Sequence, residues 1–284
     1  MRTRQIGSVR VSAIGFGAMH LSTEGRPEPA QAIRTLHAAL DAGVTVIDTA
    51  NAYCLDASET GHNERLVAAA LNQWAASARD VLVATKGGHY RSDDGTWKVD
   101  GRPERLKAAC EASLRALQVD VIGLYQFHRP DPQVPFAESV GALRELQEAG
   151  KIRMAGLSNV DVEQIREARR ILDVASVQNQ FSPDFRSSEG ELRRCAELGI
   201  AFLPWGPLGR AGAARELGVR HPDFAAVAAE RGVSPQRVAL AWALGKASVV
   251  VPIPGARRVA SILDNVAAAD LVLSDDEMER LDRG

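Results

Sequence analysis

The stretch Asp41-Ala-Gly-Val-Thr-Val-Ile-Asp48 decides the fold expected for this chain. An amphipathic, helix-like segment at 29–41 leads into it, and Gly43 stands where a helix C-cap glycine belongs. The residues from Val44 to Ile47 are all β-branched, and such a run predicts a buried strand that ends at Asp48. The stretch therefore indicates a helix followed directly by a buried strand.

The same alternation recurs along the whole chain. Strand-like runs lie near 11–17, 44–48, 81–85, 121–127, 152–157, 175–179, 200–204 and 248–251. Amphipathic stretches lie near 29–41, 63–76, 103–117, 136–149, 161–171, 188–198 and 257–269. Strands that alternate with helices indicate a parallel sheet. We therefore expect residues 1–284 to form one α/β domain, a (β/α)8 TIM barrel.

Two segments fall outside this alternation. Residues 3–12 alternate around Gly7-Ser8 and predict an N-terminal β-hairpin before the barrel begins. The segment 207–233 is rich in Gly, Ala and Arg, and it predicts a long loop with a short helix near 222–231. Such a loop would suit a cofactor clasp or a substrate lid.

The alternative fold is a doubly wound open sheet. That fold calls for a Gly-x-Gly-x-x-Gly turn after the first strand. Gly15-Phe-Gly17 is followed by Ala18-Met-His20, so the third glycine is missing. The barrel is therefore favoured.

Composition narrows the class of protein. Hydrophobic residues make up 45% and charged residues 25% of the 284 residues, as in ordinary soluble proteins. The net charge of -2 gives no reason to expect nucleic acid or an anionic membrane as partner. The 3 cysteines, Cys54, Cys110 and Cys195, are far apart, which favours a reducing compartment. With no signal-peptide or membrane-helix pattern, we expect a cytoplasmic protein that is a monomer or small homo-oligomer.

Four polar residues lie at or just beyond the ends of predicted strands. Asp48, Lys86 and His128 end three successive strand-like runs, and Tyr53 follows Asp48 closely. Strand ends converge on one mouth of a barrel, where catalytic groups gather. A phenol beside an ammonium, a carboxylate and an imidazole can donate a proton to a carbonyl oxygen. We expect Tyr53 to be the acid, Lys86 to lower its pKa, Asp48 to keep the lysine charged and pointed at the phenol, and His128 to orient the substrate.

Each of these residues has a simpler interpretation when taken alone. Asp48 could cap the turn that follows its strand, and Tyr53 could be an ordinary loop aromatic. Lys86 could be a solvated loop charge, and His128 a hydrogen-bonded loop histidine. Their coincidence at the ends of successive strands favours the catalytic interpretation.

The segments that carry these residues resemble the aldo-keto reductase superfamily. The matching motifs are Ile47-Asp-Thr-Ala50 with Tyr53, Ala84-Thr-Lys-Gly-Gly88, Tyr125-Gln-Phe-His-Arg-Pro-Asp131, Gly150-Lys-Ile-Arg153, Gly156-Leu-Ser-Asn159, Val177-Gln-Asn-Gln-Phe-Ser-Pro183, Pro204-Trp-Gly-Pro-Leu-Gly209 and Ile253-Pro-Gly-Ala-Arg-Arg258 with Asp264-Asn265. They stand in the family's order and span nearly the whole chain. The resemblance implies an NADPH-dependent carbonyl reductase of the barrel type, without a metal. Because the histidine position holds His128 rather than glutamate, it implies reduction of carbonyl groups rather than of carbon-carbon double bonds.

The resemblance also implies a set of cofactor contacts. Those near the nicotinamide and its ribose are Gly17, Ala18, Met19, Asp48, Ser158, Asn159, Gln178 and Trp205. Those near the pyrophosphate are Gly206, Pro207, Leu208 and Gly209. Those near the adenosine end are Gly255, Arg257, Ser261, Asp264 and Asn265.

Two departures from the family pattern bear on the cofactor: Asp264 stands where glutamate is more usual and is shorter by one methylene, and the residues at the 2′-phosphate differ. Where many members carry Lys-Ser and a later arginine that grip the 2′-phosphate, this chain has Gly255-Ala256 and Ser261. Arg257 and Arg258 could supply that charge, or they could be solvated residues that open the last helix. A guanidinium is unfavourable in a first helical turn, which favours the phosphate role and hence NADPH over NADH.

The substrate is less defined than the reaction. Met19, His20, Tyr90, Trp97 and Phe181 follow predicted strand ends and are candidates for the pocket wall. The polar stretch from Tyr90 to Trp97 predicts a long loop that either contacts substrate or is a mobile surface loop. The alternative function is an NADPH-binding regulatory or interaction subunit of the same fold, and a reductase of a dedicated sugar or polyketide pathway is a third possibility.

Overall fold

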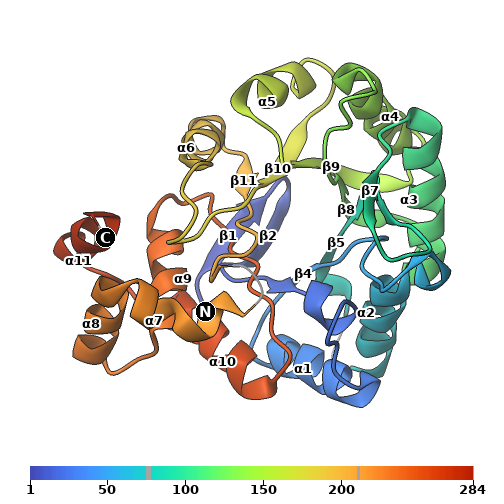
Figure 1. The fold of residues 1–284 in the computed structure, drawn as a ribbon. Coiled ribbons are helices and arrows are strands. Elements are labelled where there is room, and N and C mark those ends of the chain that lie inside the picture. Colours follow the sequence, from blue (N-terminus) through green and yellow to red (C-terminus); the bar gives the residue numbers. More distant parts are fainter. Residues whose placement is uncertain (75–77, 210–211, 284) are drawn as a thin grey trace.

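A computed structural model describes residues 1–74, 78–209 and 212–283 (Figure 1). Seven strands form one curled sheet in the order β11-β10-β9-β8-β5-β4-β3, and all neighbours are parallel. The strands are β3 Phe16–Gly17, β4 Val46–Asp48, β5 Leu82–Gly87, β8 Ile122–Phe127, β9 Ile152–Ser158, β10 Val174–Gln178 and β11 Ala201–Phe202. The predicted barrel class is confirmed.

The segment 249–255 lies between the two edges of this sheet. It is hydrogen-bonded to β11 on one side and to β3 on the other, where the N–H of Gly17 donates to the carbonyl of Pro254 (3.1 Å). The strand predicted at 248–251 is not regular, because Pro252 and Pro254 have no N–H to add to a ladder. The segment still joins both edges and so takes the eighth position of the ring.

Most helices surround the sheet. They are α1 Pro29–Asp41, α2 His62–Gln73, α3 Pro103–Leu117, α4 Phe136–Glu148, α5 Val162–Ala168, α6 Glu189–Leu198, α9 Pro235–Gly245 and α10 Val259–Ala267. The short helices α7 Leu217–Arg220 and α8 Pro222–Arg231, with α11 Asp275–Arg283, project to one side of the ring (Figure 1). The short helix predicted at 222–231 is thus confirmed as α8. Residues 75–76 of the second predicted helix and 210–211 of the predicted loop lie outside the described residues. No helix in the described ranges is long and apolar enough to span a bilayer.

The predicted N-terminal hairpin closes one end of the barrel. Strands β1 Thr3–Ile6 and β2 Val9–Ser12 pair antiparallel. Ile6 and Val11 are buried in one cluster with Val46 and Leu82, which stand at the starts of β4 and β5. The hairpin therefore fills the end at which the strands begin and leaves their carboxyl ends open for a site.

The polar stretch after β5 is a hairpin rather than a loop. Strands β6 His89–Arg91 and β7 Trp97–Val99 pair antiparallel. In the connecting turn the N–H of Ser92 donates to the carbonyl of Thr96 (3.0 Å), and the N–H of Thr96 donates to Asp94 (2.9 Å). The expectation of a long loop is wrong, because these turn bonds let the polar residues form a ladder.

Candidate active site

The four residues predicted to be catalytic lie together at the carboxyl ends of the strands. The ammonium of Lys86 donates to the Asp48 carboxylate (2.7 Å), to the Tyr53 hydroxyl (2.9 Å) and to the carbonyl of Thr49 (2.9 Å). The ring of His128 meets that of Tyr53 edge-on, with centroids 5.8 Å apart. All four are at least nine-tenths buried. One lysine thus links a carboxylate to a phenol in a nearly closed site.

Two glutamines hold the other oxygen of Asp48. The side-chain amide of Gln178 donates to Asp48 Oδ1 (2.8 Å), and that of Gln126 lies 3.4 Å from the same oxygen. Because Oδ2 faces Lys86, each carboxylate oxygen has its own donors and the side chain cannot turn freely. Gln126 was not among the predicted residues, although a fully buried glutamine in an apolar strand was a visible signal.

Burial and neighbouring charges set the protonation states. Burial lowers the pKa of Lys86, but Asp48 and Tyr53 raise it by more, so the net pKa lies above its ordinary value. Burial raises the pKa of Tyr53 above 10, and this outweighs the lowering by Lys86. The expected net lowering of the tyrosine pKa is therefore wrong. At neutral pH the lysine is charged and the phenol keeps its proton.

His128 is an uncharged imidazole beside a second histidine. Burial, His89, Lys86 and Arg129 together hold the pKa of His128 well below 6.5. Burial, Arg129 and Lys86 lower the pKa of His89 to about 4. The two ring centroids are 4.3 Å apart. Both rings are therefore neutral near pH 7.

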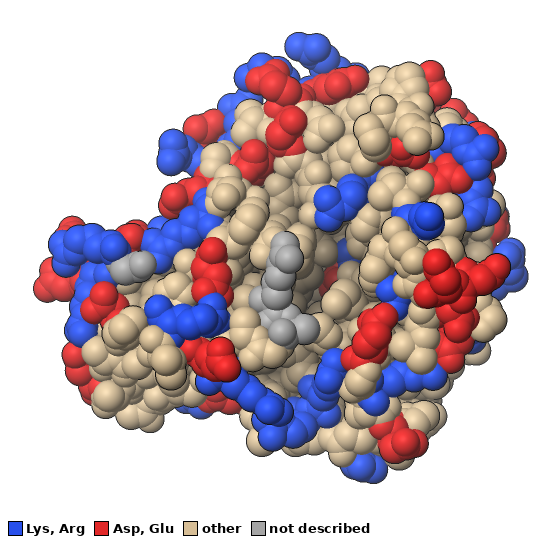
Figure 2. Space-filling model, in the orientation of Figure 1, with Lys and Arg blue, Asp and Glu red and all other residues tan. Residues whose placement is uncertain are grey.

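The hairpin β6–β7 supplies a wall beside the phenol. Trp97 meets Tyr53 edge-on at 6.4 Å between centroids and lies 5.8 Å from His89. Because His128 contacts both His89 and Tyr53, the four aromatic rings form a closed cycle of contacts. Trp97 remains 38% exposed, so it lies where the site opens to solvent. Figure 2 shows the face seen in Figure 1, hollowed near its centre, with charged side chains of both signs around its margin.

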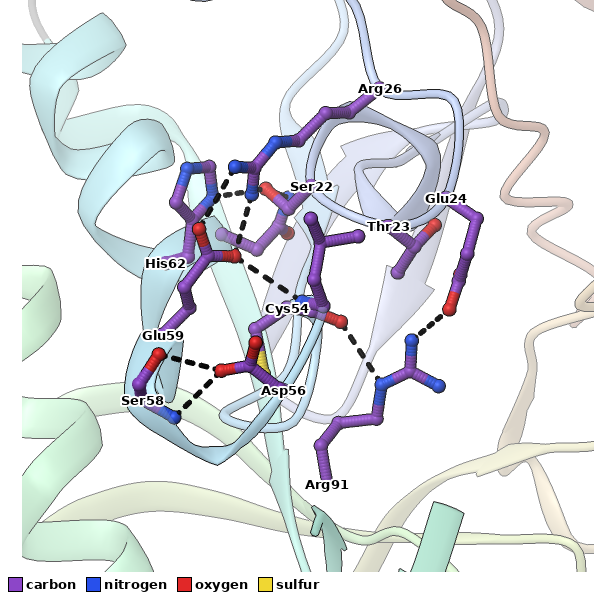
Figure 3. A network of polar contacts seen from close by, with 12 residues as sticks. Ser22, Thr23, Glu24, Arg26, Cys54, Asp56, Ser58, Glu59, His62 and Arg91 are labelled. Atoms are coloured by element: carbon purple, nitrogen blue, oxygen red, sulfur yellow. Dashed lines mark hydrogen bonds and ion pairs between the residues drawn. The ribbon is translucent and has the colours of Figure 1, made fainter. Parts of the chain in front are cut away.

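A network of polar contacts fixes this hairpin to its neighbours (Figure 3). Arg91 donates to the carbonyl of Cys54 (3.1 Å), pairs with Glu24, and lies 4.3 Å above the Trp97 ring. The Cys54 thiol is buried, and burial raises its pKa to about 11, so it is a packed thiol rather than a reactive one. Arg91 therefore fixes both the hairpin and the loop that contains Glu24.

The predicted nicotinamide contacts lie side by side. Ser158 Oγ donates to the carbonyl of Gln178 (2.9 Å), and Asn159 Nδ2 donates to Ser158 Oγ (3.0 Å). The indole N–H of Trp205 donates to Asn159 Oδ1 (3.2 Å). Asn159 has φ of 58°, a left-handed conformation that asparagine tolerates better than most residues. These side chains form a polar row next to Asp48.

The predicted pyrophosphate contacts form a tight turn after Trp205. Gly206 and Gly209 have φ of 58° and 90°, and the N–H of Gly209 donates to the carbonyl of Gly206 (2.9 Å). Pro207 and Leu208 lie between them. On the opposite side, the N–H of Ala18 donates to the carbonyl of Asp48 (2.8 Å), which places 17–19 beside the tetrad.

At the predicted adenosine end, two side chains already have partners within the chain. Both oxygens of Asp264 are engaged, by Arg237 (2.7 Å) and by Ser234 (2.5 Å). Arg257 donates to the carbonyl of Glu24 (2.8 Å). Arg258 is exposed at the start of α10, with its guanidinium 3.5 Å from Ser261 Oγ. Gly255 precedes α10, and Asn265 lies within it.

One pocket candidate is a core residue instead. Phe181 is fully buried, and its ring stacks on that of Trp242 in α9, 5.3 Å away and nearly parallel. It therefore cannot line the pocket wall. Within the described residues, no three His, Cys, Asp or Glu side chains gather in a way that could hold a metal ion.

Comparison with known proteins identifies close structural and sequence relatives. The model of the Aldo/keto reductase family matches residues 13–283. An uncharacterized oxidoreductase of Schizosaccharomyces pombe is 34% identical over 284 residues, which cover 99% of this chain and 89% of that protein. The match thus extends over nearly the whole of both sequences.

Solved structures agree with the sequence relatives. The glycerol dehydrogenase of Gluconobacter oxydans superposes with a TM-score of 0.85 at 28% identity, covering 99% of this chain and 94% of that one. An aldo/keto reductase of Klebsiella pneumoniae, solved in complex with NADP and acetate, gives a TM-score of 0.83 at 30% identity, covering 99% and 93%. The fold is therefore shared along the full length of these enzymes.

Proposed function

The chain belongs to the aldo/keto reductase family and is an oxidoreductase, and from this premise we propose that it reduces an aldehyde or ketone to an alcohol with NADPH. The observation that carries the proposal is the position of the Lys86 ammonium, 2.7 Å from Asp48 and 2.9 Å from the Tyr53 hydroxyl. This arrangement holds a protonated phenol beside a fixed positive charge.

We assign the proton transfer to Tyr53. Carbonyl reduction builds negative charge on oxygen, and a proton donor in contact with that oxygen lowers the barrier. Burial keeps the phenol protonated at neutral pH, and Lys86 stabilises the phenolate that forms when the proton leaves. Asp48 keeps the lysine charged and oriented, and the neutral His128 can hydrogen-bond to the substrate oxygen.

Bound NADPH would supply the hydride, and the surrounding residues fit such a group. The polar row of Ser158, Asn159 and Gln178 suits a carboxamide, with Trp205 beside it as a flat surface. In this proposal the turn at 206–209, with Gly206 and Gly209 in left-handed conformations, lies along the pyrophosphate. The full proposed set is Gly17, Ala18, Met19, Asp48, Ser158, Asn159, Gln178, Trp205, Gly206, Pro207, Leu208, Gly209, Gly255, Arg257, Ser261, Asp264 and Asn265.

Preference for NADPH over NADH rests on two arginines in this proposal. Arg258 is exposed next to Ser261, a position that suits a 2′-phosphate. Arg257 would have to exchange its bond to the Glu24 carbonyl for one to the phosphate. The carboxylate of Asp264 accepts from Ser234 and Arg237 and so holds the start of α9 against α10, next to the proposed adenosine site.

The substrate we propose is a small carbonyl compound with a planar part. Trp97 meets the Tyr53 ring edge-on and also contacts His89, and aromatic walls favour flat groups through stacking and edge contacts. Aromatic aldehydes and α-keto aldehydes therefore rank above keto-sugars in the expected order of turnover.

The decisive test compares Tyr53→Phe with wild type on a carbonyl panel, following NADPH oxidation. We expect turnover to fall by ~10²–10⁴, the usual contribution of a general acid, while NADPH binding is retained. Tyr125→Phe is the matched control, because the Tyr125 hydroxyl donates to the carbonyl of Leu106 in α3 (3.1 Å) rather than to a residue of the tetrad.

Two results would count against this proposal. A Tyr53→Phe enzyme that keeps turnover within about threefold of wild type would remove the acid role from Tyr53. Absence of turnover on every carbonyl, with NADPH still bound, would favour the alternative of a cofactor-binding interaction subunit.

A further inference from the structure

The first turn of helix α2 contains a fully buried asparagine with every polar position in use. Asn63 Nδ2 donates to the carbonyl of Ala18 (2.9 Å) and to Ser22 Oγ (2.7 Å), and its Oδ1 accepts from Thr49 Oγ1 (2.6 Å). The residue is 0% exposed. A buried amide with three partners in different segments holds those segments at fixed distances.

Two of the three partners of Asn63, Thr49 and Ala18, adjoin groups assigned to the reaction. The carbonyl of Thr49 accepts from the Lys86 ammonium (2.9 Å). The N–H of Ala18 donates to the carbonyl of Asp48 (2.8 Å). Asn63 therefore bonds to the residue that holds the lysine and to the loop proposed to lie along the cofactor.

The next residue on the helix reinforces this connection. Glu64 accepts from Thr85 Oγ1 (2.5 Å), which precedes Lys86 on β5, and from Asn51 Nδ2 (3.4 Å). The N–H of Asn51 in turn lies 3.4 Å from the carbonyl of Lys86. The start of α2 is thereby linked to Thr85, which precedes Lys86, and through Asn51 to the backbone carbonyl of Lys86 itself.

The loop on the other side is fixed independently. His62, the first residue of α2, lies 2.8 Å from Ser22 Oγ, as Figure 3 shows. Arg26 also pairs with Glu59 (2.7 Å). Because several contacts hold this loop, removal of one bond from Asn63 should shift it slightly rather than unfold it.

We propose that Asn63 is a positioning residue that couples the loop 18–22 to the Lys86–Tyr53 pair. The inference rests on the proposed function, since it assigns loop 18–22 to the cofactor and Tyr53 to proton transfer. Asn63 touches neither substrate nor cofactor. It acts by holding Thr49 under the lysine and Ala18 beside Asp48.

The test variant is Asn63→Asp, which keeps the size of the side chain and the acceptor for Thr49. Its second oxygen would face the carbonyl of Ala18 in place of a donor. We expect kcat to fall by about 10–100-fold and the Kd for NADPH, measured by fluorescence titration, to rise about tenfold. Asn72→Asp is the matched control on the same helix, because Asn72 is exposed and its side-chain amide donates to Gln118 (3.0 Å) rather than to a residue near the tetrad.

A double-mutant cycle with Tyr53→Phe distinguishes a loss of positioning at the lysine-tyrosine pair from a general loss of activity. If Asn63 acts through the lysine-tyrosine pair, Asn63→Asp should lower kcat by less than about threefold in the Tyr53→Phe background. A full, multiplicative loss in that background would overturn the inference, and so would unchanged NADPH binding together with unchanged kcat. Retention of activity by Tyr53→Phe alone would instead refute the proposed function.

A second pair of variants covers the case in which Asn63→Asp does not fold. Thr49→Val removes the hydroxyl that donates to Asn63 Oδ1, while the backbone carbonyl of residue 49 still faces Lys86. Thr49→Ser keeps a hydroxyl at this position. We expect a loss of kcat in the valine variant and its recovery in the serine variant. Equal activity of the two would overturn the inference.

Discussion

Lys86 is fully buried and still carries its charge, because Asp48 accepts from its ammonium at 2.7 Å. Lys86→Met would leave the Asp48 carboxylate buried without its cation. We expect the free energy of unfolding to fall by about 3–5 kcal/mol, as for other broken buried pairs. We also expect kcat to fall ~10²-fold or more, because the phenolate at Tyr53 loses its stabilising charge. Urea denaturation and NADPH-oxidation assays measure the two effects.

Adding Asp48→Asn to Lys86→Met separates stability from chemistry. The double variant removes both charges, so much of the lost stability should return while turnover does not. Recovery of turnover in the double variant would show that the lysine charge is not needed for the reaction.

The depressed pKa values of His89 and His128 predict a pH-dependent stability. His89 has a pKa of about 4 in the folded chain against 6.5 when unperturbed. Between these values the unfolded state binds more protons, so this contribution is complete above about pH 6.5 and is lost as the pH falls toward 4. We expect His89→Gln to reduce the loss of unfolding free energy between pH 7 and pH 5 by about 1–2 kcal/mol in urea titrations.

His37→Gln is the control for this titration, because His37 lies on α1 and bonds to the carbonyl of Ala70, away from Lys86 and Arg129. If the free energy of unfolding depended on pH in the same way in His89→Gln, His37→Gln and wild type, the loss of stability in acid would have to come from other groups.

The positions of the proposed catalytic residues could be predicted from sequence because they depend on strand ends. Asp48, Lys86 and His128 follow strands that the β-branched runs define, and parallel strands bring such ends together. Burial and side-chain pairing could not be predicted in the same way. The raised pKa of Tyr53 follows from desolvation, and the bond between Asp264 and Arg237 follows from how α9 packs on α10.

At the level of elements, the strands and most helices followed from periodicity, whereas some elements did not. The hairpin β6–β7 was expected as a loop because its residues are polar, although Asp94-Gly95 is a turn signal. The helix α11 was missed despite the capping pattern Ser274-Asp-Asp-Glu277, in which the N–H of Ser274 donates to Glu277 (2.7 Å). The segment 249–255 closes the ring without regular strand structure because of its prolines.

The anchoring of β6–β7 by Arg91 predicts an effect on substrate binding. Arg91→Gln would remove the pair with Glu24 and the charge above Trp97, so the aromatic wall would lose its fixed position. We expect KM for an aromatic aldehyde to rise about tenfold with kcat changed by less than about threefold. Lys98→Gln on the same hairpin is the control. A fall in kcat at constant KM would contradict a wall role for the hairpin.

At the scale of the whole molecule, part of the stability comes from a region separate from the barrel mouth. The barrel mouth holds the buried polar network, while α11 packs against α8 and α9 outside the ring (Figure 1). Leu281 of α11 is fully buried, and the neighbouring Asp282 accepts from the indole N–H of Trp242 (2.6 Å) and pairs with Lys246 (2.7 Å). The apolar contact should dominate, because exposed ion pairs contribute little.

Leu281→Ala tests this separation. Loss of the buried side chain should lower the free energy of unfolding by about 2–4 kcal/mol, the usual cost of a cavity of this kind. Turnover should stay within about twofold of wild type, because the main contacts of α11 among the described residues are with α8 and α9 rather than with the strands that carry the tetrad. Glu279→Ala, exposed on the same helix, should change stability by less than about 0.5 kcal/mol. A parallel loss of turnover in Leu281→Ala under folded conditions would mean that α11 is coupled to the barrel mouth, with the stacked rings of Trp242 and Phe181 as the connecting contact.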